Sequence, residues 1–287
     1  MKAVPEARYF RHLVSAVSRL RERRTFVSPR FRIDCRDSDA QIPTLRERPF
    51  MEDMLMNLLY LSDVFCPWCY GFGPVMQRIL AAHPDLSVRV LAGNLMDEPL
   101  TLSEMKEDHP SIREFFIRLE KTTGQSVEAF LRVLDGAGSG GPDWRMYSPE
   151  TCVPLAALKK LAPGHALEQM EAFQHAFYAE GRDVLDPSVQ HEIAARWAVA
   201  AEDFDRECSD AELRECAERE SAEAVEIMGE FRLYPTLYLE RDGERELLAR
   251  GYAPWETVSS KLEKALSGVS GGFAEGAACG LDGKCCS

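Results

Sequence analysis

The first clear pattern of hydrophobic positions marks two strands with a helix between them. Residues 58–61 form a short apolar run within a strand predicted at residues 56–61, and residues 86–91 form a second predicted strand that is rich in valine and leucine. Runs of this length are typical of buried strands. Between them, apolar residues recur at helical spacing at Val75, Ile79 and Ala82. Pro67 suits the first turn of this helix, where its missing N–H is no loss.

From about residue 99 to residue 228 the pattern is helical throughout. Large apolar residues recur three or four positions apart in several groups, which predicts five or six helices. Strand signals return in residues 236–239 and 247–249. These two segments flank Asp242-Gly243, a dipeptide typical of a tight hairpin turn. Residues 254–266 are then predicted to form a closing helix.

The order of these elements predicts an α/β fold with a helical insertion. A right-handed crossover can bring the two separated pairs of strands into one sheet. The predicted organisation is a basic, disordered leader (1–53), a sheet-containing domain (54–98 and 229–266), a helical insertion domain (99–228) and a flexible tail (267–287).

Charge is distributed unevenly along the chain of 287 residues. Its net charge is −13, but residues 1–50 hold 12 Lys/Arg and 6 Asp/Glu, whereas the remainder holds 22 and 41. The strongly acidic character of the chain after residue 50 argues against nucleic acid as a partner, because phosphate binding needs a basic surface. No stretch approaches the roughly 20 uninterrupted apolar residues of a membrane span, so we expect no membrane partner.

The leader has no apolar core of the kind that a secretory signal needs. It is rich in arginine like an organellar transit peptide, but its acidic residues count against that interpretation. The simplest interpretation is a disordered extension, or upstream sequence before a start at Met51, Met54 or Met56. Nine cysteines in a chain without an export signal indicate a reducing compartment, so we expect a cytoplasmic location.

Cys66-Pro67-Trp68-Cys69 lies at the predicted junction of strand and helix. At a helix start the free N–H groups and the positive end of the dipole stabilise a thiolate. We therefore expect a lowered pKa for Cys66, which would be the nucleophile. Cys69 would resolve any mixed disulfide that Cys66 forms. No histidine or lysine lies between them, so we expect a milder oxidant than proteins with a histidine there.

Other residues near this motif are candidates for supporting roles. Asp63 lies three residues before Cys66 and could relay a proton or cap the turn. Trp68 is expected to be exposed and to contact apolar parts of a substrate, whereas Phe72 is expected to pack in the core.

A metal site is an alternative use of the cysteines. Cys66 and Cys69 could form half of a zinc site, but Cys279 and Cys285 are a poor match for the second half. Cys279, Cys285 and Cys286 in the tail could shuttle electrons to the Cys66–Cys69 pair, clamp a soft metal, or form a plain reduced tail. The sequence leaves these three possibilities open, and no metal ligand set is assigned.

The Cys-x-x-Cys motif between strand and helix, the helical insertion, and Tyr234-Pro235-Thr236 before a hairpin together resemble the DsbA-like branch of the thioredoxin fold. The form Cys-Pro-Trp-Cys-Tyr-Gly is similar to cytoplasmic members described as protein disulfide isomerases. The resemblance covers residues 56–266. It implies that Pro235 is cis and faces Cys66, and that the backbone at Tyr234 and Thr236 binds an extended substrate. Valine or threonine is more usual at the position of Tyr234.

The resemblance implies a thiol–disulfide oxidoreductase or protein disulfide isomerase that needs no bound cofactor. Its partners would be protein or small-molecule thiols and disulfides. One alternative is a thiolate metal-binding or metal-delivery protein that uses the tail. A second is a glutathione-dependent isomerase or transferase of the kappa-like branch, but these relatives usually lack the second cysteine, which is present here as Cys69.

Overall fold

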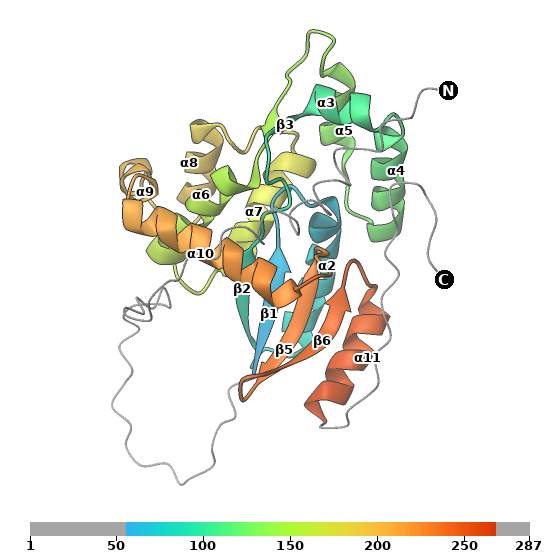
Figure 1. The fold of residues 1–287 in the computed structure, drawn as a ribbon, viewed down its shortest axis with the longest axis vertical. Helices are drawn as coiled ribbons and strands as arrows, with labels where there is room; N and C mark the ends of the chain where they lie inside the picture. Colours follow the sequence, from blue (N-terminus) through green and yellow to red (C-terminus); the bar gives the residue numbers. More distant parts are fainter. Residues whose placement is uncertain (1–55, 268–287) are drawn as a thin grey trace.

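The computed structural model describes residues 56–267, so the leader and the cysteines of the tail lie outside it. Four strands form one mixed sheet in the order β2-β1-β5-β6 (Figure 1). The strands are β1 (Met56–Ser62), β2 (Ser87–Ala92), β5 (Thr236–Arg241) and β6 (Glu244–Arg250). β1 runs parallel to β2 and antiparallel to β5, and β5 and β6 form the predicted hairpin. Its turn residues, Asp242 and Gly243, both have positive φ.

The side chains of β1 divide between two apolar clusters because successive residues of a strand point to opposite faces. Leu58 and Tyr60 belong to the main core, together with side chains of α2 (Pro67–Ala82) and α11 (Trp255–Leu266). Leu59 and Leu61 belong to a smaller cluster on the other face, which α10 (Ala211–Met228) covers (Figure 1). Burial on both faces explains why residues 58–61 of this strand form a continuous apolar run.

Eight helices and a small two-stranded sheet lie between β2 and β5 in the sequence. They are β3 (Leu100–Thr101), α3 (Leu102–Asp108), α4 (Ile112–Thr123), α5 (Glu128–Gly136), β4 (Arg145–Met146), α6 (Ser148–Leu161), α7 (Ala166–Tyr178), α8 (Pro187–Ala195), α9 (Ala201–Cys208) and α10. The prediction of five or six helices was wrong. The two helices that the pattern did not indicate are α3, with 7 residues, and α9, with 8, because so few residues do not establish a helical period.

Among the helices that the structure describes, α10 is the longest, with 18 residues, and charged side chains occur along most of it. Of the helices between residues 56 and 267, none is long and apolar enough to cross a membrane.

Aromatic rings connect the helical insertion to the segment that precedes the two cysteines. The rings of Phe130 and Phe177 lie 5.1 Å apart at their centroids, and Phe177 packs edge-on against Phe65 at 5.2 Å. The hydroxyl of Tyr178 donates a hydrogen bond to the backbone oxygen of Phe65 at 2.8 Å. Residues of α5 and α7 therefore hold the segment just before Cys66 in place.

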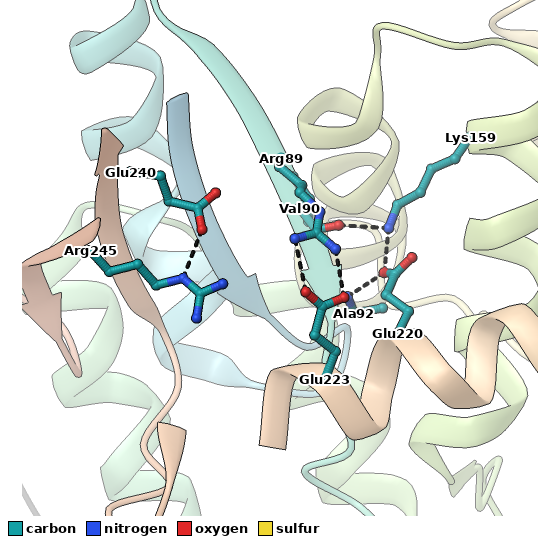
Figure 2. A network of polar contacts seen from close by, with 8 residues as sticks. All are labelled: Arg89, Val90, Ala92, Lys159, Glu220, Glu223, Glu240 and Arg245. Carbon is teal, nitrogen blue, oxygen red and sulfur yellow. Dashed lines mark hydrogen bonds and ion pairs between the residues drawn. The ribbon is translucent and has the colours of Figure 1, made fainter. Parts of the chain in front are cut away.

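Charged side chains from the insertion also cover the edge strand β2 (Figure 2). Lys159 of α6 donates to the backbone oxygen of Val90 at 2.8 Å and pairs with Glu220 of α10 at 2.5 Å. Glu220 accepts the N–H of Ala92 at 2.7 Å. These side chains satisfy backbone groups of an edge strand that could otherwise pair with another chain. They also fix α6 and α10 against the sheet next to the turn that follows β2.

Candidate active site

Cys66 and Cys69 lie at the junction of β1 and α2, as the sequence predicts. Cys66 is the N-cap of α2, with φ −87° and ψ 110°, and Pro67 occupies the first turn. The N–H of Cys69 donates a hydrogen bond to Cys66 Sγ at 3.3 Å. Both cysteines are free thiols. An N-cap position satisfies one of the N–H groups at the helix start and holds the two sulfur-bearing residues within one helical turn.

Both sulfurs lie among apolar side chains. Cys66 is 3% exposed and Cys69 is fully buried, and the smaller apolar cluster that contains them also includes Leu61, Met228 and Tyr234. Burial raises the pKa of the Cys66 thiol well above its usual value, and the neighbouring Cys69 thiol adds to this rise. The Cys69 N–H lowers the pKa, but burial outweighs it. The expected lowering of this pKa was therefore wrong for this arrangement.

The raised pKa of Cys66 has a chemical consequence. A thiol–disulfide protein is strongly oxidising when its reduced form is stabilised as a thiolate. Here burial disfavours the thiolate, so this stabilisation of the reduced form is missing. Because its pKa is raised, Cys66 loses its proton at a higher pH than an ordinary cysteine does.

The Tyr234–Pro235 peptide bond is cis, as predicted, and Tyr234 packs in the same apolar cluster as the two cysteines. Thr236 pairs with Leu61 in the register of β5 on β1, so Pro235 lies at the end of β1 that leads to Cys66. The N–H of Gly251 donates to the Pro235 oxygen at 2.7 Å. By contrast, no residue between 56 and 267 bonds the backbone N–H or oxygen of Tyr234. These two groups are the ones that an added strand would use.

The side chains of Tyr234 and Thr236 are both buried, so neither presents a side chain to a substrate. The hydroxyl of Thr236 donates to the Leu233 oxygen at 2.6 Å. A substrate-binding role for these residues, acting through their backbone, stays a prediction.

The ring of Tyr234 is held by a neighbour that the sequence did not indicate. A Cβ added to Gly93 would lie 2.5 Å from three atoms of this ring, including its hydroxyl oxygen, so only glycine leaves room for it. The N–H of Asn94 donates to the Tyr234 hydroxyl at 3.2 Å, and the N–H of Gly93 donates to the Ser62 oxygen at 2.6 Å. A glycine directly after a strand does indicate a close backbone approach. It does not indicate a tyrosine 141 positions later in the printed sequence as the partner.

Asp63 is 1% exposed and caps the turn before Cys66. Its carboxylate accepts the N–H of Phe65 at 2.8 Å and that of Leu95 at 2.9 Å. Burial raises the pKa of this carboxyl, although its hydrogen bonds, including one with Ser148, lower it. Asp63 therefore fixes the turn after β2 against the turn after β1. Its role in proton transfer stays a prediction.

Trp68 is half-buried rather than exposed as predicted. Its ring lies edge-on to Phe115, with centroids 5.8 Å apart, and over Tyr252 at 5.4 Å. These two rings, which come from α4 and from the segment before α11, cover part of the indole. Phe72 is fully buried in the main core, which confirms its predicted place. Contact of Trp68 with a substrate stays a prediction.

The metal alternatives depend on residues outside the structure. Cys279, Cys285 and Cys286 lie beyond residue 267, so the structure does not bear on the shuttle or clamp proposed for the tail. In the described part of the chain there is no group of three or more potential metal ligands.

No protein-family model matches this sequence, and no curated protein matches it. Among solved structures, a candidate protein disulfide isomerase from Nitrosomonas europaea is 21% identical with a TM-score of 0.61, over 75% of this chain and 99% of that one. The cytosolic disulfide reductase DsbM from Pseudomonas aeruginosa, solved with GSH, is 22% identical with a TM-score of 0.56, over 74% and 99%. A candidate DsbA oxidoreductase from Streptomyces coelicolor is 20% identical with a TM-score of 0.57, over 81% and 99%.

At these identities the likeness concerns the fold. The mixed sheet, the helix that begins at the Cys-x-x-Cys motif, and the helices inserted between β2 and β5 agree with it. The chain therefore has the DsbA-like form of the thioredoxin fold, with a large helical insertion.

Proposed function

We propose that the protein is a thiol–disulfide oxidoreductase that exchanges disulfides through Cys66 and Cys69. One observation supports this most strongly. Two free thiols lie within the first turn of α2, the N–H of Cys69 bonds Cys66 Sγ, and the unpaired backbone of Tyr234 lies beside them. Three structures with this fold are named as a disulfide isomerase, a disulfide reductase and a DsbA oxidoreductase, whereas a fourth, with a TM-score of 0.52, is named as a 2-hydroxychromene-2-carboxylate isomerase.

The reaction begins when Cys66 loses its proton and its thiolate attacks one sulfur of a substrate disulfide. A bond forms between Cys66 and that sulfur, and the other substrate sulfur leaves with the electron pair and takes up a proton. Cys69 then loses its proton and attacks Cys66 Sγ, which releases the second substrate thiol. The products are two substrate thiols and a Cys66–Cys69 disulfide, so two electrons pass from the protein to the substrate.

The pair is reduced again by two equivalents of a small thiol, through the same two exchange steps in reverse. We propose glutathione as this thiol, because the DsbM structure with this fold contains GSH. A cytoplasmic, reducing environment would supply it, and the location stays a prediction from the sequence.

We propose that the net direction is reduction of substrates. Because burial raises the pKa of Cys66 and disfavours its thiolate, the reduced form lacks the stabilisation that makes a strong oxidant.

The test of this direction is the equilibrium potential of the Cys66–Cys69 pair in glutathione buffers, with the oxidised fraction measured by thiol labelling after acid quench. We expect a value closer to that of thioredoxin, about −270 mV, than to that of DsbA, about −120 mV. A value near −120 mV would show that the protein is an oxidant and would overturn the proposed direction.

A further inference from the structure

One face of α7 holds the chain on both sides of the Cys-x-x-Cys motif. Glu171, Gln174 and Tyr178 are spaced i, i+3 and i+7, so their side chains lie on the same face of this helix. Gln174 Nε2 donates a hydrogen bond to the backbone oxygen of Asp63 at 3.0 Å. The Tyr178 hydroxyl donates to the backbone oxygen of Phe65 at 2.8 Å. Glu171 instead contacts α2, the helix that begins at the motif.

The carboxyl group of Glu171 lies against α2 without a cation beside it. Its Oε2 atom accepts a hydrogen bond from Gln77 Nε2 at 2.6 Å, and its Oε1 atom is buried without a hydrogen-bond partner. A Cβ added to Gly73 would lie 3.4 Å from Oε1, so this oxygen is close to the α2 backbone. No lysine, arginine or histidine between residues 56 and 267 forms an ion pair with Glu171. A buried oxygen in this position is better tolerated on a neutral acid than on a carboxylate.

The groups that face Glu171 are neutral or acidic. Gln77 of α2 and Gln125 of the segment before α5 carry uncharged amides. Glu168, one turn earlier on α7, adds a like charge, and the Tyr60 hydroxyl of β1 is near enough for Glu171 to raise its pKa. Burial raises the pKa of Glu171 itself to about 7; the hydrogen bond from Gln77 opposes this rise, and the charge of Glu168 adds to it.

The direction of the pH dependence follows from the two states of the chain. A glutamate has an ordinary pKa of 4.5, so the unfolded chain loses this proton at a lower pH than the folded protein does. The folded protein therefore holds the proton more tightly. The stabilisation that results is complete below about pH 4.5 and is lost as the pH rises through about 7.

We infer that Glu171 is a pH-sensitive positioning residue, which packs α7 against α2 as a neutral acid and loosens this contact as a carboxylate. The same face of α7 bonds the backbone just before Cys66 through Gln174 and Tyr178. Loss of the Glu171 proton therefore weakens the support of the turn that holds Cys66. This role holds whether or not Cys66 and Cys69 exchange disulfides.

The test measures urea unfolding of the reduced full-length protein between pH 5.5 and pH 8.5. We expect the unfolding equilibrium constant of the wild type to rise over this range about tenfold more than that of Glu171→Gln, which can still accept the hydrogen bond from Gln77 but carries no charge. Other groups with raised pKa values, such as Asp63, titrate in both proteins and cancel in the comparison. Glu168→Gln is the control on the same helix. It should keep most of the wild-type pH dependence, because Glu168 is exposed.

Two substitutions of the exposed Gln77 should move the pH dependence in opposite directions. Gln77→Ala removes the donor that lowers the pKa of Glu171, so the loss of stability should shift to higher pH. Gln77→Lys places a cation beside the carboxylate, so the loss should shift to lower pH and most of the change between pH 5.5 and pH 8.5 should disappear. If Glu171→Gln has the same pH dependence as the wild type, or if both Gln77 variants keep the wild-type profile, the role assigned to Glu171 is wrong.

Discussion

Replacement of Cys66 by serine is expected to reduce disulfide reductase activity by at least about 10³-fold, because a hydroxyl cannot replace the thiolate as nucleophile. The substitution is nearly isosteric, and the N–H of Cys69 can bond the serine hydroxyl as it bonds Cys66 Sγ. Folding should therefore be preserved. The measurement is the rate of insulin precipitation in the presence of dithiothreitol.

The matched control for this experiment is Cys208→Ser. Cys208 is also a free cysteine, but it belongs to α9 of the insertion and has no part in the proposed reaction. We expect this variant to keep wild-type activity. Substantial insulin reduction by Cys66→Ser would mean that another group attacks the substrate, and the assignment of the nucleophile would have to be abandoned.

Gly93→Ala is expected to destabilise the protein by about 2–3 kcal/mol, because the new methyl group would overlap the ring of Tyr234. The ring atoms are 2.5 Å from the added Cβ, and the tyrosine is only 6% exposed, so it has little space to move away. A displaced Tyr234 would also move the backbone groups that precede Pro235. The variant should therefore lose activity under conditions in which it is still folded. Urea unfolding measures the change in stability.

Two further variants separate the destabilisation caused by overlap with Tyr234 from any destabilisation that alanine itself causes at this position. In a Tyr234→Ala background the overlap is absent. Gly93→Ala should therefore lower the free energy of unfolding by at least about 1 kcal/mol less in that background than in the wild type. Gly73→Ala is the control, because its Cβ would meet its nearest neighbour, Glu171, at an ordinary 3.4 Å inside helix α2. It should be neutral or stabilising. If Gly93→Ala lowered the free energy of unfolding equally in both backgrounds, the proposed contact would be disproved.

Much of the sheet could be predicted from the sequence because its strands have strong local signals. Residues 58–61 of β1 are buried on both faces and so form a continuous apolar run, and Asp242-Gly243 supplies the positive φ angles of the hairpin turn. The position of Cys66 at the start of α2 also follows from neighbouring residues, since Pro67 fits the first helical turn. These features depend on residues close together in the chain.

The features that the sequence did not predict depend on distant residues. The pKa of Cys66 is raised because Tyr234 and Met228, far away in the sequence, complete the apolar cluster around it. The fit of the Tyr234 ring against Gly93 likewise arises only when the end of β2 and the segment before β5 come together. Short helices such as α9 were missed because a few residues cannot establish a period.

The claim that Cys66 attacks and Cys69 resolves is tested most directly by trapping the intermediate. A reduced Cys69→Ser variant is mixed with glutathione disulfide, and the adduct is located by mass spectrometry of peptides without reduction. The account predicts a glutathione bound through a disulfide to Cys66 in this variant, and no lasting adduct at Cys66 in the wild type, where Cys69 displaces it. An adduct found only at other cysteines, or an equally lasting adduct at Cys66 of the wild type, would contradict it.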